Sequence, residues 1–255
     1  AKASHFCWAA DDSSDPESHE RTPMPELTAE PRRGRLQLVA VPLLLILAGI
    51  AALPVDVPID QWVRGCDIPG IVDDIFVAGE SFGNAAGAIL IVLTISVLAP
   101  DLRRRTPVIL CAALCSGLAS QAVKVFVSRT RPRDLPPDIA SFAETFQWPF
   151  QMTLENIRIR SLPSSHTATA VGLAVALAWC FPRGRWLFTG LAALVAVQRV
   201  EIRAHYPSDV LFGAALGWCV AHLCLAASQR WTNQTGNADV CSNDNGQQPE
   251  LAEAA

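Results

Sequence analysis

Residues 36–55 read LQLVAVPLLLILAGIAALPV, a run of 20 residues without a charged side chain. A helix rises about 1.5 Å per residue, so this run matches the roughly 30 Å hydrocarbon core of a membrane. Five more apolar runs follow it along the chain: Phe82–Ala99, Pro107–Val123, Thr167–Phe181, Trp186–Gln198 and Val210–Ser228. The series predicts an all-α fold, a polytopic membrane helix bundle with six transmembrane spans.

Composition divides the chain into three parts. Of its 255 residues 51% are hydrophobic and 17% are charged, and the charges crowd into the two ends and a few loops. Residues 1–31 and 229–255 are predicted to be a disordered polar leader and a disordered polar tail, because they hold too little apolar surface to offset the entropy of ordering. Residues 32–228 between them are predicted to be one membrane domain. The net charge of -4 excludes the basic surface that a nucleic-acid partner requires.

Arginine placement predicts the orientation of the spans. Three arginines lie within residues 32–35, just before the first run, and three more lie at Arg103–Arg105, just after the second. Positive charges favour the cytoplasmic side, so both ends of the chain are predicted to be cytoplasmic. The segments 56–81, 128–165 and 199–209 are then predicted to face outward from a plasma (inner) membrane.

Polar residues interrupt the apolar pattern in three clusters. The first cluster is Lys124 with Arg131-Pro132, after the third run. The second is Pro163-Ser164-Ser165-His166, before the fourth run. The third is Arg199 with His205 and Asp209, after the fifth run. Successive spans alternate in direction, so the end of the third, the start of the fourth and the end of the fifth reach the same face of the membrane. The three clusters are therefore predicted to form one site.

The residue types of these clusters suit a phosphate group. Lys124, Arg131 and Arg199 are cations, and arginine presents a planar fork of donors to a tetrahedral oxyanion. Ser164 and Ser165 stand where the fourth run begins, so their hydroxyls and the free N–H groups of a helix N-terminus favour anion binding.

Two histidines and an aspartate add reactive groups to this site. His205 and Asp209 are four residues apart, a spacing that lets the carboxylate reach the imidazole if the segment is helical. A carboxylate on Nδ1–H leaves Nε2 free as a nucleophile. His166 then remains as the opposing acid.

The three clusters resemble the signature of the type 2 phosphatidic acid phosphatase superfamily, which includes glucose-6-phosphatase and the vanadium haloperoxidases. Its first motif, Lys-x6-Arg-Pro, is matched by residues 124–132. Its second, Pro-Ser-Gly-His, is matched by residues 163–166 with Ser165 in place of glycine. Its third, Ser-Arg-x5-His-x3-Asp, is matched by residues 198–209 with Gln198 in place of serine. The resemblance covers roughly residues 107–228 and so places the motif-bearing part of a phosphatase domain within 32–228.

The resemblance implies a role for each motif residue. His205 would attack phosphorus to form a phosphohistidine, Asp209 would orient it, and His166 would protonate the leaving oxygen. The phosphoryl oxygens would be held by five residues: Lys124, Arg131, Ser164, Ser165 and Arg199. No metal and no cofactor are expected, because the cations supply the positive charge. The expected partners are the bilayer and a lipid phosphate or diphosphate, hydrolysed at the outer face.

Several points stay open from the sequence. A lipid phosphotransferase or a non-catalytic phospholipid-binding membrane protein would use the same site, and the oligomeric state is unspecified. The candidate substrates are isoprenyl diphosphate, phosphatidic acid, phosphatidylglycerol phosphate and a saccharide-lipid phosphate. Five arginines lie outside the motifs and are predicted to face solvent or lipid headgroups: Arg129, Arg133, Arg158, Arg160 and Arg203. Arg133 and Arg203 are the expected exceptions.

Overall fold

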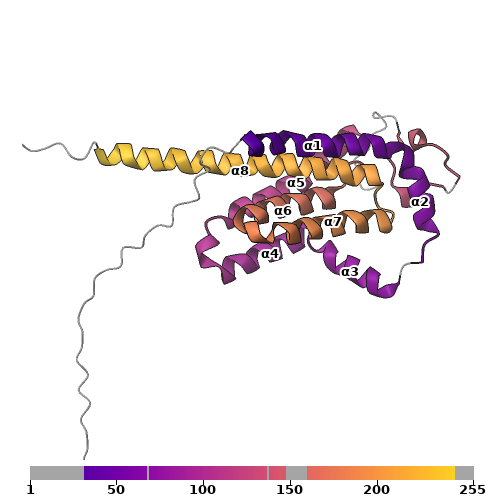
Figure 1. Cartoon of the computed structure of the whole chain (residues 1–255), viewed down its shortest axis with the longest axis horizontal. Coiled ribbons are helices and arrows are strands. Elements are labelled where there is room, and N and C mark those ends of the chain that lie inside the picture. Colours follow the sequence, from indigo (N-terminus) through magenta and orange to yellow (C-terminus); the bar gives the residue numbers. More distant parts are fainter. Residues whose placement is uncertain (1–31, 68, 137, 148–159, 245–255) are drawn as a thin grey trace, which may run out of the picture.

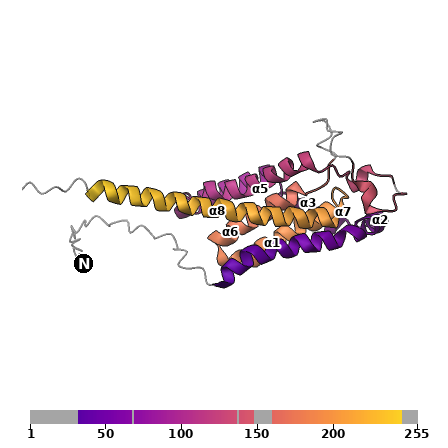
Figure 2. The same cartoon turned by 90° about the horizontal axis from the view of Figure 1, so that it is seen from above.

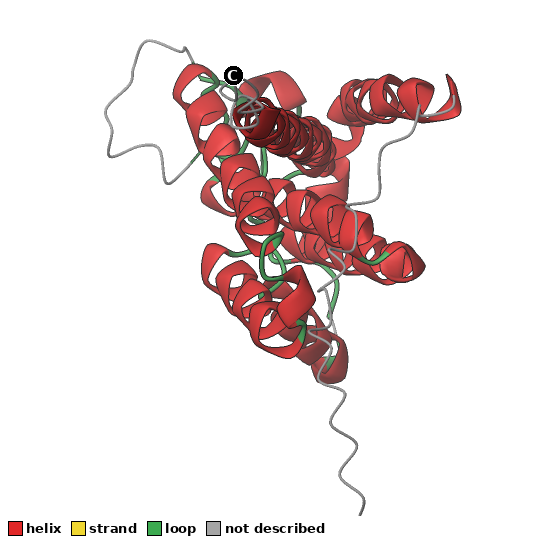
Figure 3. Ribbon diagram, turned by 90° about the vertical axis from the view of Figure 1, so that its left-hand side faces the viewer, coloured by secondary structure: helices red, strands yellow, loops and turns green. Residues whose placement is uncertain are grey.

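The structure, a computed structural model, describes residues 32–67, 69–136, 138–147 and 160–244 (Figure 1). Within these ranges the chain forms helices joined by loops and short 3-10 turns, and no strand (Figure 3). The helices are α1 (Arg32–Ala52), α2 (Asp56–Arg64), α3 (Gly70–Glu80), α4 (Ala85–Leu98), α5 (Thr106–Phe126), α6 (Ser165–Cys180), α7 (Arg185–Glu201) and α8 (Pro207–Asp244). The predicted all-α fold is confirmed.

The helix α6 is the central element of the bundle. It packs against α5, α7 and α8, while α1 lies along α8 and α4 lies along α5 (Figures 1 and 2). Beyond the end of α1, α2 turns across the end of the bundle at which α8 begins (Figure 1). The loops that carry the polar clusters are at this same end.

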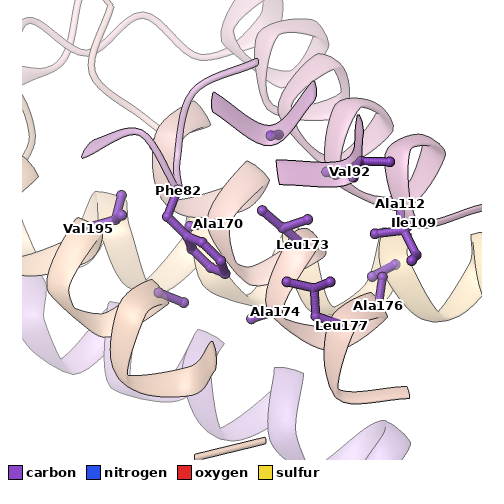
Figure 4. Packing of buried hydrophobic residues seen from close by; sticks show 14 residues of the cluster. Phe82, Val92, Ile109, Ala112, Ala170, Leu173, Ala174, Ala176, Leu177 and Val195 are labelled. Atoms are coloured by element: carbon purple, nitrogen blue, oxygen red, sulfur yellow. The ribbon is translucent and has the colours of Figure 1, made fainter. Parts of the chain in front are cut away.

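Small and branched apolar side chains fill the core around α6. Leu173 and Leu177 of α6 belong to one buried cluster with Ile109 of α5, Val92 of α4 and Val195 of α7 (Figure 4). The rest of the cluster is largely alanine. Small residues allow helix backbones to approach closely in a membrane, where packing rather than the hydrophobic effect holds helices together.

Two glycines let α8 lie directly on the start of α6. A Cβ atom at Gly213 would come 2.6 Å from the carbonyl oxygen of Ser164, and one at Gly217 would meet the carbonyl oxygen of Ala168 even more closely. The two glycines are four residues apart and share one face of α8. Because these two residues have no side chains, the second polar cluster can lie directly against the first turns of α8.

Three helical segments are long and apolar enough to cross a membrane: Leu36–Arg64, Thr106–Phe126 and Pro207–Trp231. A fourth is added if α3 and α4, which are bent by 69°, form one broken span. The protein is a multi-pass helical membrane protein, and the number six stays a prediction. The helix α6 has 16 residues and so reaches only about 24 Å. Other helices cover much of the surface of α6, so its length does not have to match the thickness of the bilayer.

The structure differs from the predicted end of the membrane domain. The helix α8 continues to Asp244, so residues 229–244 are helical where the sequence predicted a disordered tail after Ser228. No proline lies in this stretch, and each residue added to an existing helix costs little compared with starting one. Residues 1–31 and 245–255 lie outside the described residues, so the disorder predicted there stays a prediction.

Candidate functional site

The three polar clusters lie together at the end of the bundle where α8 begins (Figure 1). Lys124 is in the last turn of α5, His166 is in the first turn of α6, and Arg199 is in the last turn of α7. The backbone N–H of Ser164 donates to the carbonyl oxygen of Asp209 at 3.1 Å and so joins the second cluster to the third. Alternating helix direction thus brings distant parts of the sequence to one place.

Asp209 is the centre of a buried network. Its carboxylate accepts hydrogen bonds from Arg129 Nη1 at 2.7 Å, from the backbone N–H of Tyr206 at 2.9 Å and from the hydroxyl of Ser161. Arg129 also donates to Asp56 of α2 at 2.7 Å, and its guanidinium lies over the Tyr206 ring at 4.1 Å. A buried carboxylate requires donors of this kind. They fix the orientation of Asp209.

His205 is only 3% exposed and lies beside this carboxylate. Its Nδ1 is 3.9 Å from a carboxylate oxygen of Asp209, which is longer than a hydrogen bond, and Nδ1 has no other partner among the described residues. Asp209 therefore acts on the ring by its charge in this structure, and such contacts commonly tighten when a ligand binds.

The surroundings of His205 keep its imidazole neutral. Burial, with the added effect of the charges of Lys124 and Arg131, lowers the pKa of His205 to about 4 against the attraction of Asp209. A ring nitrogen acts as a nucleophile only in the neutral form. His205 is therefore in its reactive form at pH 7.

Two cations at the site make no salt bridge within the described residues, and acids act on them only by their charge, Asp209 on both and Asp134 on Arg131. Lys124 is buried, and its ammonium makes no hydrogen bond or ion pair within the part of the chain that the structure describes. Arg131 donates through Nε to the carbonyl oxygen of Arg160 at 3.4 Å, and in the same ranges its two Nη groups make no hydrogen bond. An anion would stabilise the buried ammonium of Lys124 and the half-buried guanidinium of Arg131, so this pair forms a candidate oxyanion site.

The start of α6 supplies further donors beside these cations. The hydroxyl of Ser164 caps the helix by accepting from the backbone N–H of Thr167 at 3.4 Å. The hydroxyl of Ser165 lies 3.0 Å from that of Ser120, so the side chain that replaces the glycine of the second motif contacts α5. The serine at this position therefore does not cover the N-terminus of α6 with its side chain.

Arg199 is held by two neighbouring side chains. Its Nε donates to Gln198 Oε1 at 2.9 Å, and its Nη2 is 2.8 Å from a carboxylate oxygen of Glu80. Gln198 Nε2 donates to the same carboxylate at 3.1 Å. The glutamine that replaces the serine of the third motif thus braces the arginine.

Glu80 is a member of this site that the motif analysis missed. Its carboxylate lies 3.6 Å from His166 Nε2 as well as against Arg199. One signal was present in the sequence: Glu80 is the one acidic residue between positions 75 and 100, next to a predicted span. An isolated acid beside an apolar run favours a functional or paired position.

The prediction that the extra arginines face solvent or headgroups is wrong for Arg129 and Arg160. Arg129 is 1% exposed and Arg160 is 4% exposed. The guanidinium of Arg160 donates to the carbonyl oxygens of Lys124 at 2.5 Å and Val125 at 3.1 Å, so it caps the end of α5. Neither role could be read from the sequence, because the residues that these arginines contact are far away along the chain.

The other three extra arginines have different outcomes. Arg203 is an exception as predicted, because its Nε pairs with Asp60 of α2 at 2.7 Å. Arg133, the other expected exception, is exposed. Arg158 lies outside the described residues.

A largely apolar cavity of about 350 Å³ opens beside the second cluster. It lies between α4, α5 and α6 and includes these residues in its lining: Asn84, Leu114, Leu118, Gln121, Ser165 and His166. An apolar group attached to a phosphate would fit here next to His166.

Three thiols form the one group in the described residues with the spacing of a metal site. The ligand atoms of Cys111, Cys115 and Cys224 lie within 4.8 Å of one another. Cys111 is 13 residues before Lys124 on α5, which places it about 20 Å along the helix from the polar clusters. The thiols therefore do not belong to the candidate oxyanion site.

Two curated proteins are similar to part of this chain. A lipid A 1-phosphatase of Rhizobium etli is 37% identical over 102 residues, which are 40% of this chain and 41% of that protein. A lipid A 1-phosphatase of Rhizobium johnstonii is 35% identical over 102 residues, which are 40% of this chain and 39% of that protein. The matched region thus spans about two fifths of the length of these relatives.

Two crystal structures share the fold at 18% sequence identity. A PAP2 type phosphatidylglycerolphosphate phosphatase from Bacillus subtilis has a TM-score of 0.56, with 76% of this chain and 97% of that chain covered. Aquifex aeolicus LpxE has a TM-score of 0.53, with 68% of this chain and 95% of that chain covered.

A family model, that of the PAP2 superfamily, matches residues 106–233, which is half of the chain and includes all three polar clusters. The resemblance drawn from the motifs is thereby confirmed. This chain belongs to the PAP2 superfamily.

Proposed function

We propose that this protein is an integral membrane phosphatase that hydrolyses a lipid phosphate. The observation that carries the proposal is the pair Lys124 and Arg131, without a salt bridge in the described residues, beside the neutral and buried imidazole of His205. Cations in this position stabilise the charge that develops on phosphoryl oxygens. The neutral imidazole is the form that attacks phosphorus.

The proposed reaction has two steps. His205 Nε2 forms a bond to phosphorus while the bond to the lipid oxygen breaks, and His166 gives its proton to that oxygen. Burial lowers the pKa of His166 to about 4, so it would take up this proton when the phosphate dianion binds beside it, with Glu80 favouring the same charged form. Water then attacks the phosphohistidine, and His166 takes a proton from it, which returns the enzyme to its starting state. Asp209 keeps the His205 ring oriented and stabilises its positive charge during transfer.

A phosphorylated lipid is the proposed substrate because a largely apolar cavity adjoins His166, the proposed acid for the leaving oxygen. The partial similarity to lipid A 1-phosphatases makes a saccharide-lipid phosphate the first candidate. Phosphatidic acid, phosphatidylglycerol phosphate and isoprenyl diphosphate complete the set to be tested.

We also propose a location for the reaction. Six spans, with both ends cytoplasmic, would place the site at the outer face of the plasma (inner) membrane, because the arginine-rich segments at 32–35 and 103–105 favour the cytoplasm. In this arrangement α6 is a short span covered by its neighbours, and α7 is a short span that packs mainly against α6 and α3.

Phosphate release from the purified protein in detergent tests the proposal. We expect release from at least one member of the lipid panel, unchanged in excess EDTA, and no release by His205→Ala. Restoration of activity only by added magnesium would mean that a metal does the work assigned to Lys124, Arg131 and Arg199.

Product analysis separates the two rival functions. In the presence of an acceptor lipid, a phosphotransferase would produce a phosphorylated acceptor rather than inorganic phosphate. A non-catalytic binding protein would retain phosphate lipids and release nothing from any of them. Either outcome would contradict the hydrolase proposal.

A further inference from the structure

Glu80 places a negative charge inside a site otherwise built to attract anions. It lies at the end of α3, outside the residues 106–233 that match the family. One carboxylate oxygen is 2.8 Å from Arg199 Nη2 and 3.6 Å from His166 Nε2, and the other accepts from Gln198 Nε2 at 3.1 Å. A carboxylate in this position has to affect which anions bind.

The three cations of the site are not equivalent because of this carboxylate. Lys124 and Arg131 make no salt bridge within the described residues, whereas Arg199 is paired with Glu80 at 2.8 Å. Two cations without a salt bridge match the charge of a phosphate monoester dianion. A third would be needed to match the additional charge of a diphosphate.

The position of Glu80 relative to His166 shows which part of a ligand would meet it. His166 is the proposed acid for the leaving oxygen, so the leaving group lies on its side of the site. When a lipid monophosphate reacts, that group is an alcohol. When a lipid diphosphate reacts at its terminal phosphorus, the leaving group is itself a phosphate, and its charge would lie next to the Glu80 carboxylate.

We propose that Glu80 is a specificity-determining residue that restricts the site to single phosphate groups and disfavours diphosphates. This inference rests on the proposed phosphate site, and it deepens that function by naming the class of substrate. Repulsion of the wrong ligand is a common source of specificity, and it operates here through one carboxylate that is two-thirds buried between Arg199 and His166.

The variant Glu80→Gln isolates the charge from the bracing role. An amide has nearly the same shape, and its oxygen still accepts from Arg199, so the variant removes the charge and only the hydrogen bond from Gln198. Glu80→Asp keeps the charge at a shorter reach. Asp74→Asn is the matched control, because Asp74 is an exposed acid on the same helix and loses the same charge away from the site.

Binding of inorganic phosphate and of pyrophosphate to the purified full chain, measured by calorimetry, tests the inference. We expect Glu80→Gln to shift the ratio of the two dissociation constants about tenfold in favour of pyrophosphate. Asp74→Asn and Glu80→Asp should keep the wild-type ratio. An unchanged ratio in Glu80→Gln, or an equal loss of affinity for both ligands, would overturn the inference and leave Glu80 as a brace for Arg199.

Kinetics with tail-matched substrates provides the second measurement. The ratio of kcat/KM for farnesyl diphosphate to that for farnesyl phosphate should rise about tenfold in Glu80→Gln and in Glu80→Ala, so the test does not depend on one variant folding. If the wild type releases phosphate from no member of the lipid panel, the proposed hydrolysis fails. The calorimetric ratio still decides the role of Glu80 in that case.

Discussion

Arg129 is a single residue outside the motifs that holds the candidate site together. It lies between two acids, Asp56 and Asp209, with a distance of 2.7 Å to each, and the two pairs are fully buried. Its guanidinium also stacks on Tyr206, whose pKa is raised by burial. Removal of one member of such a buried group leaves charges without partners, which costs much more than the group contributes in net stability.

We therefore predict that Arg129→Met strongly destabilises the protein, by about 3–5 kcal/mol. The two carboxylates would face each other without a cation, and Asp209 would lose the donor that orients it. Thermal unfolding in detergent checks the stability, and phosphate release checks the site. The control is Arg133→Met, which removes an exposed arginine and should shift neither. Equal behaviour of the two variants would contradict the role of Arg129.

The lowered pKa of His205 predicts how stability depends on pH. The unfolded chain binds a proton to this histidine near pH 6.5, whereas the folded protein does so only near pH 4. Stability should therefore fall as pH decreases from about 6.5 to about 4, by a few kcal/mol for this group. Unfolding of the wild type and of His205→Asn across this range measures the difference. A parallel pH dependence in the two proteins would show that folding does not lower the pKa of His205.

At the scale of elements, the contact between α6 and α8 positions most of the site. The second cluster starts α6 and the third ends at the first turn of α8, so the distance between these helices sets the distance between His166 and His205. Gly213 and Gly217 determine that distance by presenting bare backbone to α6. The pattern is the small-residue spacing typical of close helix pairs in membranes.

We predict that Gly217→Leu reduces phosphate release at least tenfold and lowers stability by about 1–3 kcal/mol, because the new side chain forces α8 away from Ala168. Gly190→Leu on α7 is the control, since a Cβ atom there meets nothing within 4 Å. Activity assays and thermal unfolding of both variants give the comparison. Wild-type activity in Gly217→Leu would mean that the α6–α8 distance does not set the site geometry.

At the scale of the whole molecule, the bundle has one end that is rich in interactions among charged groups. The helix α2 crosses this end and fastens to it through Asp56 with Arg129 and through Asp60 with Arg203 (Figure 1). The helix α2, which lies outside the family match, thus stabilises the site that the match contains. The three polar clusters and α2 should face the same compartment.

Thiol labelling on intact cells tests this orientation. In a protein whose other cysteines are replaced by serine, Cys66 after α2 should react with an impermeant reagent. A cysteine introduced at Arg104 should react only after permeabilisation, because the arginine-rich loop is expected in the cytoplasm. The opposite pattern would place the site in the cytoplasm and change the lipids available to it.

Local patterns in the sequence determined a large part of this protein. Long apolar runs identified α1, α4, α5, α6, α7 and the first part of α8. Each segment that crosses a membrane must be apolar on its own, so this signal is local. The motif spacing and the alternation of helices also placed Lys124, Ser164, His205 and Asp209 at one end of the bundle. These inferences needed no knowledge of which helices touch.

Only the tertiary structure decided which charged residues support the site. Arg129 and Asp56 are 73 positions apart, and Gln198 and Glu80 are 118 positions apart, so no periodicity or spacing links them. An isolated arginine or glutamate has the same local sequence signal whether it faces water or a buried partner. The difference arises from helix packing, because a charge in a low-dielectric interior is stabilised where a distant segment supplies the opposite one.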